Sequence, residues 1–136
     1  PEFTIDTQNQ YTNQKCFIIP EGGASLLGLL NSKLTFFLFR HWLPKLRGGF
    51  YEPGYVYLKH FPIAETSNSA PIQEKVNQII KQKRQNPEAG TTALERDIDV
   101  LVFKLYGLTY EEVGMIEPEF WLDKTAYNRN ELTQND

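Results

Sequence analysis

The run of residues 45–51 carries the residue types that hold anionic oxygen atoms. It reads Lys45-Leu46-Arg47-Gly48-Gly49-Phe50-Tyr51. Because glycine has no side chain, the backbone N–H groups of Gly48 and Gly49 can come close to phosphate oxygens, while Lys45 and Arg47 neutralise negative charge. Arginine also forms paired hydrogen bonds with the edge of guanine. By composition alone, an ordinary glycine turn with surface cations is the more common explanation of such a run, because charge runs usually mark solvated faces.

The charges of the chain are segregated. The net charge of -3 conceals a basic middle, because residues 33–60 hold five bases against one acid and residues 72–84 hold four bases against one acid. Residues 85–136 hold eleven acids against four bases. Segregated charge determines where a charged partner docks. We therefore expect a polyanion at the basic middle, where Lys59 adds a phosphate contact and Tyr51, Tyr55 and Tyr57 offer rings that pack on sugars or bases.

The other reactive side chains do not form a recognisable catalytic site. His41 and His60 are the two histidines and have no cysteine at ligand spacing, which argues against a zinc site. Cys16 lies in an apolar run, where a thiol is usually inert. Asp97 and Asp99 are two residues apart on an expected helix, so we place them on a solvated face near its N-terminus. The chain is therefore predicted not to be an enzyme.

Three strands and one long helix are expected in the first 64 residues. Apolar runs and alternation predict strands at residues 3–5, 16–19 and 55–63. The run from Ala24 to Leu43 predicts a single helix that is apolar on most sides and therefore buried. A stripe of small residues on it allows a neighbouring element to approach closely. This stripe comprises Ser25, Gly28, Ser32 and Thr35.

Helices are expected after a polar linker at residues 64–70. Pro71 fits a first helical turn, and an apolar stripe of Ile72, Val76, Ile79 and Ile80 predicts a helix over residues 71–85. The opposite face of this helix is rich in Lys and Gln.

Two further helices are marked by capping boxes. Thr92-x-x-Glu95 predicts the start of one helix, which Gly107 ends, and Thr109-x-x-Glu112 predicts the start of the next. Three large apolar residues, Phe120, Trp121 and Leu122, are expected to fold back onto the core. Residues 128–136 are expected to fray.

These patterns predict an α+β fold, a small mixed β-sheet packed on a long buried helix and followed by C-terminal helices. We expect residues 1–64 to form an α+β region, residues 65–117 a helical region packed on it, and residues 118–136 a tail. The single Cys16 cannot form an internal disulfide, and no apolar run is long enough to span a membrane, so a soluble cytoplasmic protein is expected. The strand-like start suggests a fragment of a longer polypeptide.

Four motifs occur in order and together resemble a known family. They are Leu26-Leu27-Gly28-Leu29-Leu30-Asn31-Ser32-Lys33-Leu34, Leu46-Arg47-Gly48-Gly49-Phe50-Tyr51, Leu58-Lys59-His60-Phe61-Pro62-Ile63 and Asp99-Val100-Leu101-Val102-Phe103-Lys104-Leu105-Tyr106-Gly107-Leu108-Thr109. Over residues 3–117 the chain resembles the TaqI-like C-terminal specificity domain of type IIG restriction–modification enzymes. The Pro62-Ile63 pair at the end of the expected strand is followed by a helix that begins near Gln73. This pattern also resembles type I specificity subunits.

The resemblance implies a target-recognition domain for double-stranded DNA that is not itself catalytic. In the family, an upstream methyltransferase domain of the same polypeptide carries S-adenosylmethionine and flips an adenine out of the duplex. Many members also carry an N-terminal nuclease domain, for which Mg is expected. Neither cofactor is expected in this fragment. The acidic C-terminal helices depart from a DNA surface, and we expect them to pack on the rest of the enzyme or to face water.

The resemblance also divides the roles of the residues. Relatives with different target sites share the Asn31-Ser32 and Arg47-Gly48-Gly49 signatures, so these should hold the frame or grip phosphates. Base choice should then lie with less typical neighbours, which are Tyr51, Glu52 and Tyr55 or the turn at residues 7–14. Glu52 could accept a hydrogen bond from a cytosine amino group.

The leading hypothesis is therefore a DNA target-recognition domain of a bifunctional restriction endonuclease and adenine methyltransferase. Its predicted phosphate contacts are Lys45, Arg47, Gly48, Gly49 and Lys59. One alternative is an assembly module in which the helices at residues 71–85 and 93–106 bind another protein. A second alternative is a catalytic domain with a site that the known motifs do not reveal.

Overall fold

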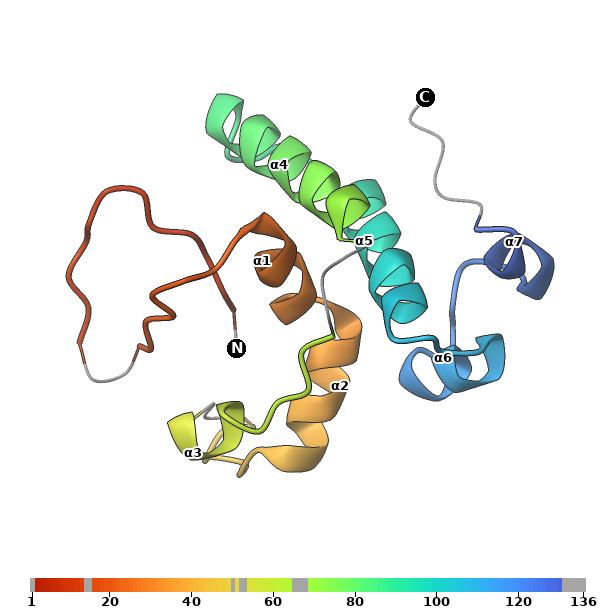
Figure 1. Ribbon diagram of the computed structural model, residues 1–136, viewed down its shortest axis with the longest axis horizontal. Helices are drawn as coiled ribbons and strands as arrows, with labels where there is room; N and C mark the ends of the chain where they lie inside the picture. The colour runs from red at the N-terminus through yellow and green to blue at the C-terminus, as the bar shows by residue number, and fades with distance from the viewer. Residues whose placement is uncertain (1, 14–15, 50, 52–53, 65–68, 131–136) are drawn as a thin grey trace.

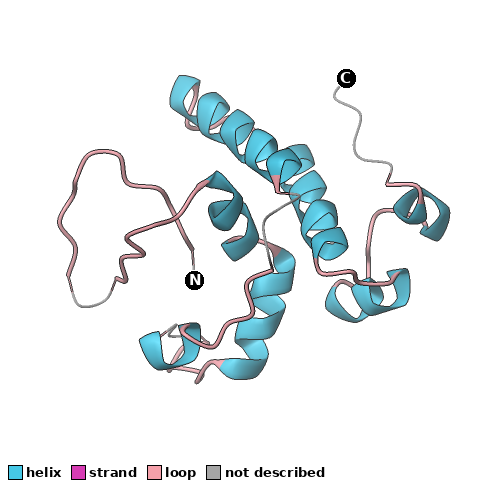
Figure 2. Cartoon of the chain, in the orientation of Figure 1, coloured by secondary structure: helices cyan, strands magenta, loops and turns pink. Residues whose placement is uncertain are grey.

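The computed structural model describes residues 2–13, 16–49, 51, 54–64 and 69–130, which fold into helices and connecting loops (Figures 1 and 2). In chain order the helices are α1 (Ala24–Leu30), α2 (Lys33–Trp42), α3 (Tyr55–Leu58), α4 (Ala70–Gln85), α5 (Thr92–Leu105), α6 (Tyr110–Ile116) and α7 (Lys124–Asn128). None of them, within the described ranges, is long and apolar enough to cross a membrane.

The predicted α+β fold with a small mixed β-sheet is wrong. Among the described residues the strand pairing is a single antiparallel bridge between Lys45 and Tyr51, and no sheet forms. Residues 3–5 and 16–19 lie in the long N-terminal loop, with Ile18 and Ile19 exposed. Apolar alternation predicts a strand only where a partner strand is available, and neither segment has one here.

The predicted strand at residues 55–63 begins instead as a helical turn, α3. Its N-cap is Gly54, whose carbonyl accepts hydrogen bonds from the backbone N–H groups of Tyr57 (2.9 Å) and Leu58 (3.1 Å). Only Leu58 of this turn packs on a core cluster, while Tyr55 and Val56 are exposed. Over four residues, a period-two pattern cannot be distinguished from one turn of helix.

The single helix predicted from Ala24 to Leu43 is divided into α1 and α2 by Asn31 and Ser32. Ser32 has an extended backbone and caps α2, because its hydroxyl accepts a hydrogen bond from the backbone N–H of Thr35. The same hydroxyl donates to the carbonyl of Leu29 at 2.7 Å, which closes the end of α1. Two of the small residues, Ser32 and Thr35, therefore lie at the break between α1 and α2 and do not form part of a continuous helical face.

Gly28 does allow the close approach that the small-residue stripe predicts. A Cβ placed on Gly28 would lie 2.8 Å from Val76 Cγ2 and 2.9 Å from Ile72 Cγ2, both on α4. The helix predicted at residues 71–85 is confirmed as α4, with Pro71 in its first turn and with Ile72 and Val76 buried. Because α4 packs along both α1 and α5, it joins the two halves of the chain (Figure 1).

The hydrophobic core has two clusters. The larger one lies among α4, α5, α6 and α7 and also takes in Leu34 of α2. The expectation that Phe120, Trp121 and Leu122 fold back onto the core is confirmed, since all three pack in this cluster. The smaller cluster lies beneath α1, α2 and the loop that follows α3. Its buried members are Leu29, Leu30, Phe39, Leu43 and Phe61.

The C-terminal helices follow their local signals closely. Gly107 ends α5 with a positive φ of 67°, and the capping box of Thr109 and Glu112 is present at the start of α6. The capping box predicted at Thr92 is wrong, because the N-cap is Thr91, which makes no side-chain cap hydrogen bond to the backbone and donates its hydroxyl to the Glu95 carboxylate instead. Asp123 caps α7, a helix that the sequence analysis did not predict. Of the tail expected to fray, residues 131–136 lie outside the described residues.

Candidate nucleic-acid interface

The glycine loop forms a narrow bend at the end of α2. Lys45 and Tyr51 pair across its base, and the backbone N–H of Gly49 donates to the carbonyl of Leu46 at 3.2 Å. Gly48 and Gly49 have φ values of 86° and 82°. Residues with a Cβ rarely adopt such values, so the turn depends on both glycines.

The base of the bend is fixed while its tip is open. Leu43 is buried in the smaller core cluster, and Tyr51 packs against the same cluster. The ring of Tyr51 also meets Phe36 edge-on, with centroids 6.3 Å apart. In contrast, Arg47, Gly48 and Gly49 are exposed. The bend therefore presents its cation and its backbone to solvent from a fixed position.

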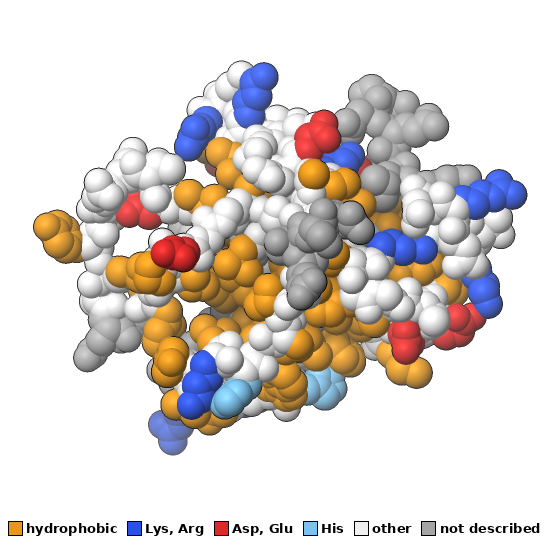
Figure 3. Space-filling model, in the orientation of Figure 1, with side chains coloured by type: hydrophobic (Ala, Val, Ile, Leu, Met, Phe, Trp, Pro, Cys, Tyr) orange, Lys and Arg blue, Asp and Glu red, His pale blue; other side chains and the backbone are white. Residues whose placement is uncertain are grey.

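Every charged side chain described between Leu34 and Ala64 is a base. These are Arg40, Lys45, Arg47 and Lys59, all exposed, and none of them has an ion pair among the described residues. We call the surface of these cations, on the C-terminal half of α2, the bend and α3, the basic end. Figure 3 shows basic side chains and histidines next to hydrophobic ones at this end of the molecule.

Aromatic rings accompany the cations. Tyr55 is 70% exposed and has the Lys59 ammonium 5.9 Å from its ring centroid. The Arg40 guanidinium lies 5.7 Å from the ring centroid of Phe36, and Trp42 is also exposed. Rings with cations beside them are typical of surfaces on which nucleotide bases and sugars pack.

The residues predicted to contact bases differ in their exposure and position. Tyr55 is exposed at the basic end, whereas Tyr51 is half-buried and its ring contacts Phe36. Glu52 lies outside the described residues. The predicted turn at residues 7–14 is described as far as residue 13. The Asp6 carboxylate holds its start by accepting hydrogen bonds from the backbone N–H groups of Gln8 (2.8 Å) and Gln10 (2.7 Å).

Helix α2 contributes more to this surface than its apolar sequence predicts. Arg40 was expected in the basic middle, but Phe36 and Trp42 were expected in a helix buried on most sides, and all three are exposed. The available signal was Arg40-His41, a polar pair that interrupts the apolar run one helical turn after Phe36.

The Asn31-Ser32-Lys33 motif holds the frame on which the basic end stands. Asn31 pairs with the backbone of Phe3 in both directions, accepting from its N–H (3.0 Å) and donating to its carbonyl (2.9 Å). The backbone N–H of Lys33 donates to the Asp99 carboxylate at 2.9 Å, and the Lys33 ammonium pairs with Glu117. One motif thus ties the N-terminal segment, α2, α5 and the end of α6 together.

The solvated face predicted for Asp97 and Asp99 is wrong. Asp97 is fully buried and forms an ion pair with Lys75 of α4 at 2.7 Å. Asp99 is also buried, and loss of hydration raises the pKa of its carboxyl to about 6, although the hydrogen bond from Lys33 acts in the opposite direction. Both carboxylates join α5 to other helices, Asp97 to α4 through Lys75 and Asp99 to α2 through Lys33.

The acidic C-terminal helices make contacts within the chain. Glu111 pairs with Lys124 and Glu117 with Lys33. Helices α6 and α7 lie at the opposite side of the molecule from α3 (Figure 1), so they do not cover the bend.

Cys16 and the two histidines do not form a reactive site among the described residues. Cys16 is exposed, so the prediction that it lies inside an apolar strand is wrong. His41 is exposed and its Nδ1 lies 2.8 Å from the carbonyl of Phe37, one turn earlier in α2. No group of three or more potential metal ligands occurs among the residues that the structure describes.

No family model, curated protein or solved structure matches this chain.

Proposed function

We propose that this chain is a DNA target-recognition domain that grips the phosphates of a duplex through the basic end. The observation that carries the proposal is the open bend, in which exposed Lys45 and Arg47 precede two exposed glycines with positive φ, and the backbone N–H of Gly48 has no hydrogen bond to a described residue. Phosphate contacts of this kind position a protein on DNA without reading its sequence. Lys59 and the exposed ring of Tyr55 extend the same surface along α3.

The parent protein would be a restriction–modification enzyme, as the resemblance of the four motifs implies. The chain would then work beside an upstream methyltransferase domain that carries S-adenosylmethionine, and with a nuclease domain that requires Mg. In this arrangement the chain is not itself an enzyme. The firm support of the bend by the smaller core cluster fits a domain that offers one fixed surface to DNA.

The proposal is tested by measuring how tightly the chain binds a fluorescent DNA duplex as salt rises. Each phosphate contact lowers the logarithm of the binding constant by about 0.9 per tenfold increase in salt. We expect Arg47→Ala to weaken binding and to reduce the salt slope by about one contact. Lys124→Ala is the matched control, because it removes an exposed cation on α7 whose pairing with Glu111 is a surface contact.

The outcome of this titration is clear in either direction. An unchanged affinity and salt slope for Arg47→Ala would remove the bend from the DNA interface. A loss of the same size for Lys124→Ala would mean that binding follows net charge and has no defined surface.

A second candidate function is a protein-assembly module, which the exposed apolar side chains at the same end favour. Val56 is 65% exposed, and Leu46, Tyr57 and Ile63 are also exposed. The apolar stripes of α4 and α5 are buried in the chain's own core, so an assembly surface is better sought at α3 than on these helices.

The oligomeric state separates the two functions. An assembly module would form a concentration-dependent dimer in analytical ultracentrifugation, and Val56→Asp would dissociate it. A DNA-binding domain would remain monomeric in the absence of DNA, and Val56→Asp would lower its affinity for duplex by adding a negative charge beside the cations.

A further inference from the structure

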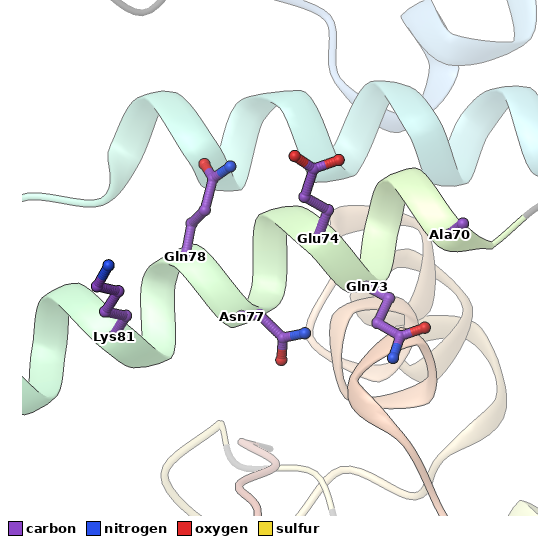
Figure 4. A pocket seen from close by; sticks show the side chains of 6 residues that line it. All are labelled: Ala70, Gln73, Glu74, Asn77, Gln78 and Lys81. Carbon is purple, nitrogen blue, oxygen red and sulfur yellow. The ribbon is translucent and has the colours of Figure 1, made fainter.

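Helix α4 carries an outward face of polar side chains. Six residues at positions i, i+3, i+4, i+7, i+8 and i+11 line a shallow trough along it. They are Ala70, Gln73, Glu74, Asn77, Gln78 and Lys81. In Figure 4, Gln73 and Asn77 point to one side of the trough, and Glu74, Gln78 and Lys81 point to the other, toward α5.

The three carboxamides on this face are free to bind a partner. The side chains of Gln73, Asn77 and Gln78 make no hydrogen bond to any described residue, and each offers two donors and an acceptor. Asn77 and Gln73 are exposed, and Gln78 is half-buried along the trough wall. The opposite face of α4 is fixed on the core through Ile72 and Val76, so these amides are held on a firm support.

The charges around the trough favour a polyanion. Lys81 and Arg84 are exposed and have no ion pair among the described residues, whereas Lys75 is engaged with Asp97. Lys83 donates to the carbonyl of Pro87 and keeps its charge at the surface. Glu74 is the one acid of α4 and stands toward the other end of the helix.

The trough is poorly suited to a protein partner. Its largest apolar side chain is that of Ala70, whereas the centres of protein interfaces are enriched in aromatic residues and depleted of Lys and Glu. Carboxamides have a well-matched partner in DNA, because Asn and Gln form paired hydrogen bonds with N6 and N7 of adenine in the major groove. An α-helix about 10–12 Å across fits that groove, and the 16 residues of α4 extend for about 24 Å.

We propose that α4 enters the major groove of duplex DNA and reads adenine-containing steps through Gln73, Asn77 and Gln78. Lys81 and Arg84 then contact the flanking phosphates. This inference rests on the proposed DNA-binding function, and it assigns base reading to a helix that is separate in the fold from the bend at the basic end.

The test is selection of binding sites from a randomised DNA duplex pool, followed by affinity measurements on the selected duplex. The double variant Asn77→Ala/Gln78→Ala is compared with Arg47→Ala and with Asn128→Ala. Asn128 is the matched control, because it is an exposed amide on α7 whose side chain makes no hydrogen bond to the described residues. Thermal unfolding checks that the variants remain folded, as expected for changes on an exposed face.

We expect the unmodified chain to select a sequence with fixed adenines. The Asn77→Ala/Gln78→Ala variant should lose about tenfold or more of its preference at one or two of those adenines. Its affinity for unselected duplex should stay unchanged, because the phosphate contacts remain. Arg47→Ala should weaken binding to all sequences alike and select the same adenines, and Asn128→Ala should change neither quantity.

Three results would overturn the inference. The α4 variant could select the same sequence as the unmodified chain, in which case the proposed function would survive. The unmodified chain could bind duplex without any preference, in which case phosphate binding by the basic end would survive but target recognition would not. If α4 instead mediates protein assembly, the double variant would change the oligomeric state and leave DNA selection intact. A chain that binds no duplex even at low salt would overturn the proposed function itself.

Discussion

The carboxylate of Asp99 accepts a hydrogen bond from the backbone N–H of Lys33 at 2.9 Å, across 66 positions of sequence. Lys33 is the first residue of α2, whose N-terminal N–H groups have no partner within the helix, so Asp99 satisfies one of them from α5. The Lys33 ammonium reaches Glu117 beyond α6. The direction in which α2 leaves the core, and with it the position of the bend, is therefore set by α5.

The first prediction concerns the pH dependence of stability. Burial raises the pKa of Asp99 from 3.8 to about 6 in the folded chain, so the folded state binds its proton more tightly than the unfolded state. The protonated carboxyl of Asp99 stabilises the folded chain fully below about pH 4. This contribution to the free energy of unfolding, about 3 kcal/mol in total, is lost as the pH rises through 6. Asp99→Asn should remove this dependence and stabilise the chain at pH 7.

Urea unfolding of the chain and of Asp99→Asn at pH 7 and near pH 4 measures this difference directly. The gap between the two proteins should be largest at pH 7 and should close at the lower pH. An Asn variant that is less stable by the same amount at both pH values would mean that the ionised carboxylate is required and that its burial has no net cost.

The second prediction concerns the buried ion pair of Lys75 and Asp97. Asp97 is fully buried, so Lys75→Ala leaves a buried carboxylate without its cation, and a loss of about 3–5 kcal/mol is expected. The matched control is Lys124→Ala, which breaks a fully exposed pair and should leave the free energy of unfolding almost unchanged. The measurement is the free energy of unfolding in urea. Equal losses for the two variants would show that the burial of Asp97 does not affect the free energy of unfolding.

The third prediction contrasts two glycines within helices. A Cβ at Gly28 would lie within 3.0 Å of both Ile72 and Val76, so Gly28→Ala must push α4 away from α1. Gly114 in α6 has nothing within 4 Å of the same position, and Gly114→Ala should stabilise the chain by about 0.5–1 kcal/mol through helix propensity. Thermal unfolding should move in opposite directions for the two variants. A rise in melting temperature for Gly28→Ala would contradict the close contact of α1 with α4.

The fourth prediction concerns the N-terminal segment. Asn31 holds the backbone of Phe3 through two hydrogen bonds, each worth about 1 kcal/mol. Asn31→Ala should release this segment, and limited proteolysis should cut the chain before α1 faster than in the unmodified protein. Cleavage between α4 and α5 serves as the internal reference. An unchanged rate ahead of α1 would show that Phe3 is held by its packing on Phe39 alone.

Local signals in the sequence predicted the second half of the fold well. The apolar stripe of α4, the capping box at Thr109 and the helix stop at Gly107 are short-range features, in which the residues that make the contact lie within one or two turns. The break between α1 and α2 had a local signal too. Asn31-Ser32 inside an apolar run is a strong N-cap sequence, but the high apolar content around it favoured one continuous helix.

The errors came from contacts between distant residues. The burial of Asp97 and Asp99 depends on Lys75 and Lys33, which lie 22 and 66 positions away, and no periodicity along α5 reveals those partners. The strand predicted at residues 55–63 failed for a similar reason, since alternation does not show whether a pairing strand exists. At the candidate site, the sequence predicted the exposed cations of the bend, but it missed the exposed side of α2.

The central claim is that the glycine bend contacts DNA, and an NMR titration of the ¹⁵N-labelled chain with duplex tests it most directly. The backbone amides of Gly48 and Gly49 should shift early and in proportion to bound DNA, because the N–H of Gly48 would meet a phosphate oxygen and Gly49 is the next residue in the bend. The amides of Gly107 and Gly114, on the α5–α6 side of the molecule, should remain in place. Saturable binding that shifts Gly107 and Gly114 while Gly48 and Gly49 stay unmoved would contradict the claim.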